Sequence, residues 1–208
     1  MINQIRREVG EKKYNDAERD LFALRKSAPH HVGVPLISAA AHVAMHRYDA
    51  ALADCNVAIS LLQENAPNAV GDAYEARAEV YLRMGNPGAS RADFERALSS
   101  NKKNPEYNNA LAWLLATSTD AAVRNGPLAV RYATTANTLS GTHDAEMIDT
   151  LAAAEAEAGD FDLAAKYERQ ALTLFKAKET HGAEKRLSLF EKHQPFRFDP
   201  AHSPPASE

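Results

Sequence analysis

The feature that most constrains the fold is a stretch of sequence that recurs along the chain. The segment Lys13–Ala17 (KYNDA) returns as Arg47–Ala51 (RYDAA), with the two tyrosines 34 positions apart. A second echo joins Gly85 to Gly159, and the 74 positions between them leave room for two repeats with a small insertion. A period of about 34 residues is typical of a repeat made of two helices. The chain is therefore predicted to consist of repeated helical hairpins.

Each repeat is predicted to contain two helices, and the third repeat shows this most clearly. Tyr74, Ala78 and Tyr81 fall on one stripe at helical spacing. The segment Gly85–Pro87 then breaks the helix, and a second stripe follows at Ser90, Phe94, Ala97 and Leu98. Roughly one residue in five is alanine, the strongest helix former. Because neither helix can bury its apolar face alone, neighbouring pairs must stack, and an all-α fold is predicted.

These positions resemble the tetratricopeptide repeat (TPR) family. The third repeat carries the family's order of large and small residues most fully, and the fifth carries it at Leu151, Gly159 and Phe161. Residues from about 107 to 198 also resemble an arrangement of these repeats that is widespread in bacteria, with the marks NNALAWLLATS, DTLAAAEAEAGDFDLA and RLSLFEKHQPFRF. The resemblance implies a right-handed superhelical solenoid of about five TPR-like helix hairpins plus a C-terminal capping helix.

The same resemblance divides the chain. A helical repeat domain is expected over residues 1–198, and a disordered tail over 199–208. The fourth repeat carries an insertion of about five residues between Thr117 and Pro127, which we interpret as an enlarged connection between its helices. The expected boundaries are about 1–31, 32–70, 71–104, 105–144 and 145–178 for the five repeats, and about 182–193 for the capping helix.

The composition argues against several classes of protein. The formal net charge is -4, which disfavours a nucleic-acid binder that works by general phosphate neutralisation. No apolar run approaches the ~18 residues of a membrane span, and residues 1–10 lack the apolar stretch of a signal peptide. A cytoplasmic location is therefore expected. The first repeat is short, so a longer natural N-terminus with an export signal stays open.

The residues that most often carry chemistry are few and scattered. His42 and His46 have the spacing of two ligands to one metal, but no third ligand stands near them, so structural histidines are the favoured interpretation. Cys55 is the single cysteine, which excludes an internal disulfide and a zinc site of several cysteines. No glycine-rich phosphate loop or acid/base pair can be proposed from spacing. We therefore expect no catalytic residue, no metal and no cofactor.

The TPR resemblance implies a candidate binding surface, because in that family the first helix of each repeat lines a concave groove. Carried over by position, the candidate groove residues are Leu36, Ile37, Val43, Asp72, Glu75, Glu79, Leu82, Glu106, Asn109, Trp113, Glu146, Asp149 and Glu157. These residues predict a groove that is apolar at one end and acidic in the middle, suited to a basic or amphipathic segment. The alternative is that the apolar side chains and Trp113 pack internally while the acids form a solvated face.

The sequence therefore favours a non-catalytic adaptor or scaffold that binds a peptide or helix of another protein, with no nucleic acid and no membrane span. The alternative is a self-assembling structural protein, a homodimer, that pairs through an apolar N-terminal face of Ile2, Ile5 and Val9. A more distant hypothesis is a regulatory piece of a larger enzyme system with no catalysis of its own. The identity of the partner is not encoded in the repeats.

Overall fold

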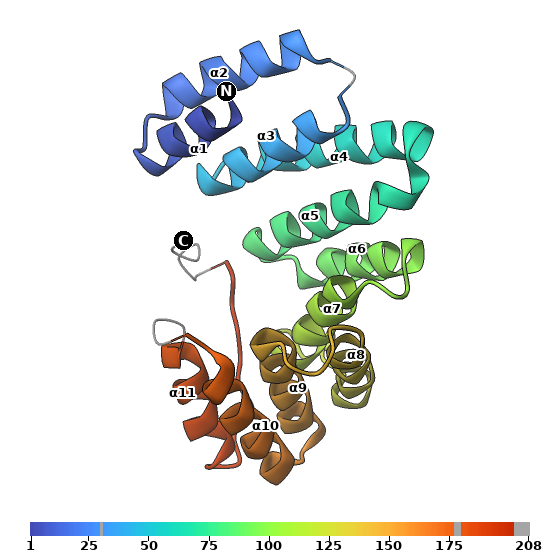
Figure 1. Ribbon diagram of the computed structural model, residues 1–208, viewed down its shortest axis with the longest axis vertical. Helices are drawn as coiled ribbons and strands as arrows, with labels where there is room; N and C mark the ends of the chain where they lie inside the picture. Colours follow the sequence, from blue (N-terminus) through green and yellow to red (C-terminus); the bar gives the residue numbers. More distant parts are fainter. Residues whose placement is uncertain (30, 177–179, 202–208) are drawn as a thin grey trace. The chain divides into compact units, whose positions relative to one another are not determined.

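A computed structural model describes residues 1–29, 31–176 and 180–201. Over these residues the chain forms eleven α-helices and one short 3-10 helix (Pro67–Ala69) and has no strand, which confirms the all-helical prediction (Figure 1). The expected tail lies outside the described residues from position 202 onward. The helices are α1 (Ile2–Gly10), α2 (Tyr14–Ser27), α3 (Gly33–Ala44), α4 (Tyr48–Asn65), α5 (Val70–Arg83), α6 (Pro87–Ser100), α7 (Pro105–Thr117), α8 (Gly126–Leu139), α9 (Ala145–Ala158), α10 (Phe161–Leu174) and α11 (Thr180–Phe190).

The described chain divides into two compact bodies. The N-terminal body comprises Met1–Ser100 together with Pro200 and Ala201, and the C-terminal body comprises Asn101–Asp199. Within each body consecutive helices pack against each other, and α3 and α4 illustrate such a pair in Figure 1. The first helices of successive pairs also pack together: α1 on α3 and α3 on α5 in one body, and α7 on α9 in the other. This packing is consistent with a helical repeat.

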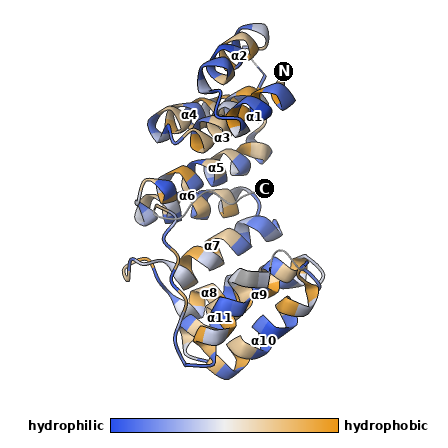
Figure 2. Ribbon diagram, turned by 90° about the vertical axis from the view of Figure 1, so that its left-hand side faces the viewer, coloured by the Kyte–Doolittle hydropathy of each residue, from blue (hydrophilic) through white to orange (hydrophobic). Residues whose placement is uncertain are grey.

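The cores of both bodies are built from small and medium apolar side chains. Blue and orange stretches alternate along the helices in Figure 2, as expected for helices that bury one face and expose the other. Ala17, Ala51, Ala97 and Ala171 each have no exposed surface, and they occupy the second helices of four different hairpins. A methyl group at these sites lets the helix axes approach closely, so the high alanine content is used in the contacts between helices.

The turns inside the hairpins provide a structural counterpart to the sequence period. Lys12, His46, Gly85 and Gly159 all have a positive φ, of 57°, 59°, 71° and 96°, and each stands two residues before the next helix. A left-handed residue at this place ends one helix and turns the chain into the next. The fourth hairpin, α7 and α8, lacks this turn and uses the longer loop 118–125 instead.

The helices of the two bodies begin in different ways. In the C-terminal body a side chain caps the start of α7, α8, α9 and α10, and the caps are Asn104, Asn125, Asp144 and Asp160. In the N-terminal body the helices α1 to α5 begin without a side-chain cap, and α6 is capped by Asn86, which accepts from the Ala89 N–H at 3.1 Å. Each cap accepts hydrogen bonds from backbone N–H groups that the helix cannot pair internally, so the caps stabilise the starts of these C-terminal helices.

The C-terminal body closes with α11 and an extended segment. The capping helix expected at about 182–193 is present as Thr180–Phe190. After it the chain turns at His193, whose φ is 55°, and runs in an extended form past α11 (Figure 1). An isolated parallel bridge pairs Phe198 with Ser118, at the end of α7. The extended residues Gln194–Phe198 are called the C-terminal segment below.

Candidate functional site: the Trp113 surface of the C-terminal body

The candidate groove residues of the N-terminal body divide into packed and exposed positions. Leu36 is half-buried against a cluster between α4 and α5, and Val43 packs against a second cluster that contains Cys55. Ile37 and Leu82 are also half-buried. These apolar positions therefore contribute mainly to internal packing, while Asp72 and Glu79 are exposed and Glu75 is half-buried.

The candidate residues of the C-terminal body are partly brought together. Glu106 and Glu146 are exposed near the starts of α7 and α9. Trp113 and Glu157 contact the C-terminal segment, and Asp149 contacts Arg186 on α11. We call Trp113, Asp149 and Glu157, together with the last turn of α7, the Trp113 surface. Asn109 lies one helical turn before Trp113, and its side-chain oxygen is buried without a hydrogen-bond partner among the described residues.

Trp113 is covered by an aromatic and cationic cluster. The ring centroids of Phe196 and Phe198 lie 5.9 and 6.1 Å from that of Trp113, with tilted and edge-on geometries. The guanidinium carbon of Arg186 lies 5.6 Å from the Trp113 centroid and 5.6 Å from that of Phe196. Offset aromatic pairs and a cation over an indole face are each favourable by about 0.5–1.5 kcal/mol, so this cluster holds the C-terminal segment in place.

Arg186 also binds two carboxylates from neighbouring helices. Its Nε lies 2.6 Å from Asp149 Oδ1 on α9 and 3.2 Å from Glu168 Oε1 on α10. Burial raises the pKa of Asp149, and burial together with the Asp149 charge raises the pKa of Glu168 to about 9. Two acids that share one guanidinium therefore retain one proton at neutral pH. The cluster is close to neutral, which lets it lie inside the body.

The C-terminal segment binds the end of α7 through both side chain and main chain. Arg197 Nη2 lies 2.6 Å from Glu157 Oε2, and its Nη1 donates to the carbonyl of Ala116 at 3.3 Å. The Phe198 N–H donates to the carbonyl of Thr117 at 2.9 Å. The last carbonyls of a helix have no hydrogen-bond partner within the helix, so the extended C-terminal segment can donate hydrogen bonds to them.

The carboxylate of Glu157 forms ion pairs with two arginines. Its Oε1 lies 3.1 Å from the Nε of Arg124, which belongs to the enlarged loop between α7 and α8, and its Oε2 binds Arg197. Arg124 also donates to the carbonyls of Ser118 and Thr119 and so shapes that loop around the last turn of α7. The inserted loop and the chain end therefore meet at one carboxylate.

Five residues that contact this surface or its acids are not among the candidates selected from the sequence. They are Glu168, Arg186, Phe196, Arg197 and Phe198. The signal available was the order Phe-Arg-Phe, because two aromatics around an arginine at the end of a charged, proline-containing stretch are unusual for a solvated tail. Pairing that order with Trp113 requires the fold, since more than 80 positions separate them.

The N-terminal body contains a second buried polar network. The imidazole of His42 lies 2.7 Å through Nδ1 from Asp54 Oδ2 and 3.1 Å through Nε2 from Glu18 Oε1. Arg25 donates twice to Asp54, at 2.9 and 3.0 Å, and Arg47 binds Glu18. The hydrogen bond to Asp54 raises the pKa of His42 in spite of its burial. A protonated imidazole can donate to both carboxylates, so the network links α2, α3 and α4 as a set of ion pairs.

His46 takes no part in this network. It stands in the left-handed turn and hydrogen-bonds the hydroxyl of Tyr48 through Nδ1 at 3.0 Å. The two histidines that share helical spacing in the sequence therefore have separate partners. Within residues 1–29, 31–176 and 180–201, no group of three or more His, Cys, Asp or Glu side chains is placed to hold a metal ion.

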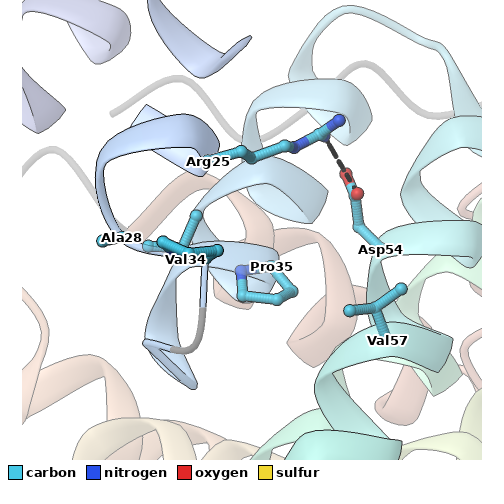
Figure 3. A pocket seen from close by; sticks show the side chains of 7 residues that line it. Arg25, Ala28, Val34, Pro35, Asp54 and Val57 are labelled. Atoms are coloured by element: carbon cyan, nitrogen blue, oxygen red, sulfur yellow. Dashed lines mark hydrogen bonds and ion pairs between the residues drawn. The ribbon is translucent and has the colours of Figure 1, made fainter. Parts of the chain in front are cut away.

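A cleft of about 280 Å³ lies beside this network. Figure 3 shows Arg25 reaching across to Asp54, with Val34, Pro35 and Val57 on the walls below. Both charged residues of the cleft are already paired with each other, so they offer little to a ligand. Cys55 is fully buried, and burial raises the pKa of its thiol to about 12, which removes it as a nucleophile at neutral pH.

The comparisons with known proteins add no family to these observations. No family model matches the chain, and no curated protein matches it. In the part of the chain that the structure describes, every helix is too short or too polar to cross a membrane. The features of the molecule that bear on function are the residues of the Trp113 surface and the arrangement of the helices.

Proposed function

We propose that the protein is a non-catalytic adaptor of the TPR type, which binds an extended segment of a partner protein on the inner faces of its first helices. The observation that carries the proposal is the seating of the C-terminal segment at candidate groove positions. Trp113 and Glu157, chosen from the sequence as groove residues, contact Phe196 and Arg197 through aromatic stacking and an ion pair. A surface that holds an extended peptide of its own chain has the chemistry to hold one from another chain.

A binding role also agrees with the state of the groups that could carry a reaction. The Cys55 thiol is buried and protonated, and the two buried carboxylates of the C-terminal body share Arg186. His42 has a carboxylate at each ring nitrogen, so neither nitrogen faces an open site. The carboxylates and His42 have structural partners, and the thiol is buried and protonated, which favours binding over catalysis.

The N-terminal apolar stripe gives less support to the alternative of self-assembly. Ile5 is 1% exposed in a cluster with Ala17 and Leu21, and Val9 packs against the same cluster. Only Ile2 is exposed, at 36%. The stripe therefore contributes mostly to the core of its own body, and a dimer through it would gain little further burial.

Site-specific photo-crosslinking tests the proposal. A photoreactive amino acid replaces Glu106 or Glu79, both exposed at candidate groove positions, and the matched control replaces Thr134, exposed on the second helix α8. In cells that naturally make the protein, we expect discrete adducts from the two groove positions and none from the control. Adducts of equal pattern from all three positions, or none from the groove positions, would contradict an adaptor that binds through its first helices.

A further inference from the structure

The C-terminal segment occupies the Trp113 surface in a way that an external ligand would have to reproduce. It uses two aromatic rings for Trp113, one guanidinium for Glu157 and one main-chain hydrogen bond to the end of α7. These contacts come from three consecutive residues, Phe196 to Phe198, and all three are only half-buried. The segment therefore binds an acidic and aromatic surface through a small number of contacts.

We propose that the C-terminal segment is a built-in occupant of this surface, and that the external ligand is an extended segment of a partner protein with the same aromatic–arginine–aromatic order. The inference rests on the proposed adaptor function and adds the ligand's chemistry and its competitor. The partner displaces the C-terminal segment and takes over its contacts with Trp113, Glu157 and the last turn of α7.

Charge and geometry both select this ligand. The Glu157 carboxylate is 14% exposed and already accepts from Arg124, so its remaining oxygen needs a cation to complete its pairing. A guanidinium supplies two donors, one for Glu157 and one for the Ala116 carbonyl, which a lysine ammonium cannot place in the same fork. Aromatic residues on both sides of the arginine then cover the indole of Trp113.

The tether favours this occupancy and leaves it reversible. Five residues, 191–195, connect the end of α11 to Phe196, and a short linker gives an effective concentration in the millimolar range. Three half-buried residues and a short main-chain contact provide modest intrinsic affinity, so the covered state is favoured mainly by the tether. Only molecules whose Trp113 surface is free can bind an external ligand, so the apparent affinity of that ligand is reduced in proportion to the fraction of such molecules. Peptides of low intrinsic affinity are therefore excluded.

A labelled peptide tests the occupant directly. The probe is the nonapeptide KHQPFRFDP, the sequence of residues 192–200, and the control peptide carries Ser, Glu and Ser in place of Phe, Arg and Phe. The full-length chain is compared with a full-length variant that carries Phe196→Ala, Arg197→Glu and Phe198→Ala. We expect the probe to bind the variant at least tenfold more tightly than the wild type, and the control peptide to bind neither.

A reversible disulfide provides a second test if the triple variant does not fold. Ser118 and Phe198 are bridge partners, so Ser118→Cys with Phe198→Cys can join the segment to α7 by a disulfide, while the native Cys55 is buried. The oxidised protein should reject the probe, and the same protein after reduction should bind it. Equal binding in the two states overturns the proposal, as does a folded triple variant that ignores the probe.

Three further outcomes test the built-in occupant and separate this inference from the proposed function. If the wild type forms a dimer that the triple variant does not, measured by light scattering, the occupant comes from a second copy and the built-in occupant is wrong. If groove crosslinks to a partner appear while the freed surface ignores the probe, the adaptor function stands and the ligand chemistry is wrong. If the probe binds the freed surface but no groove crosslinks appear, the occupant is confirmed and the adaptor function is wrong.

Discussion

The two bodies are built from the same kind of hairpin but are held together by different means. In the C-terminal body four successive helices begin with an Asn or Asp cap, and a buried cluster around Arg186 joins α9, α10 and α11. In the N-terminal body α1 to α5 lack such caps, and ion pairs around His42 and Asp54 join α2, α3 and α4. Buried charge pairing therefore stabilises both bodies, and capped helix starts add to it mainly in the C-terminal body. Removing one partner of a buried ion pair should cost more than removing a cap.

The largest effect should come from removing the shared cation of the C-terminal body. Arg186→Ala leaves Asp149 and Glu168 buried without their guanidinium and uncovers one face of Trp113. Breaking a buried ion pair from one side costs about 3–5 kcal/mol, and we expect a loss of that size in the free energy of unfolding from urea titrations followed by circular dichroism. The control, Arg169→Ala, removes an exposed pair with Glu191 and should cost at most about 0.5 kcal/mol. Equal losses would mean that the buried cluster contributes no more than a surface pair.

The second-largest effect should come from a glycine substitution in the C-terminal body, at a place where two backbones approach closely. A Cβ atom on Gly126 would lie 2.7 Å from the backbone of Ala158, where α8 begins against the end of α9. Gly126→Ala must push the helices apart, and we expect a cost of about 1–3 kcal/mol in chemical denaturation. Gly10→Ala is the matched control, since a Cβ there meets nothing within 4 Å, and its greater helix propensity should leave stability equal or slightly raised. A neutral Gly126→Ala would show that this contact can relax freely.

The pH dependence of the N-terminal body gives a third comparison. Because folding raises the pKa of His42 above its ordinary 6.5, the protonated histidine contributes stability that is fully present below pH 6.5. That contribution is lost as the pH rises through the folded pKa. Hydrogen exchange of α2–α4 peptides, corrected for intrinsic rates, should show protection that falls as the pH rises above 6.5, relative to His42→Gln. The same slope in both proteins would remove His42 as the cause.

The smallest effects should come from exchanging helix caps between the bodies. Asp160 caps α10 from a backbone conformation of φ -90° and ψ 79°, and Lys13 precedes α2 with a similar φ of -83° and ψ of 58°. We expect Asp160→Ala to cost about 1 kcal/mol and Lys13→Asp to add a few tenths of a kcal/mol, both measured by thermal unfolding. If Lys13→Asp destabilises the protein, the missing caps of the N-terminal body reflect a constraint other than cap chemistry.

The parts of the fold that depend on local pattern could be predicted from the sequence. The hairpins, the turn at Gly85 and the closing helix follow from helical stripes and from residues that tolerate positive φ. The turn at His46 is harder to predict, because histidine seldom adopts a positive φ. Its position follows only from the 34-residue spacing between Lys12 and His46. Helix starts in the C-terminal body could likewise be located from Asn104 and Asp160.

The polar clusters could not be predicted, because their members come from distant positions. The repeat pattern places Asp149 among the groove acids, yet the residue is 8% exposed and shares Arg186 with Glu168. A stripe pattern places a residue on a helix face but does not say which later helix covers that face. The same holds for Trp113, for which internal packing and ligand stacking were both open. It packs against aromatic residues that arrive from the chain end.

The position of the tryptophan has a practical consequence. Trp113 is the single tryptophan of the chain, so all indole emission comes from one ring under Phe196 and Phe198. Lifting those rings away would admit water to the indole and shift its emission to longer wavelength. The molecule therefore carries an intrinsic fluorescent sensor for the position of its C-terminal segment, readable in the unlabelled native protein during a titration or a rapid-mixing experiment.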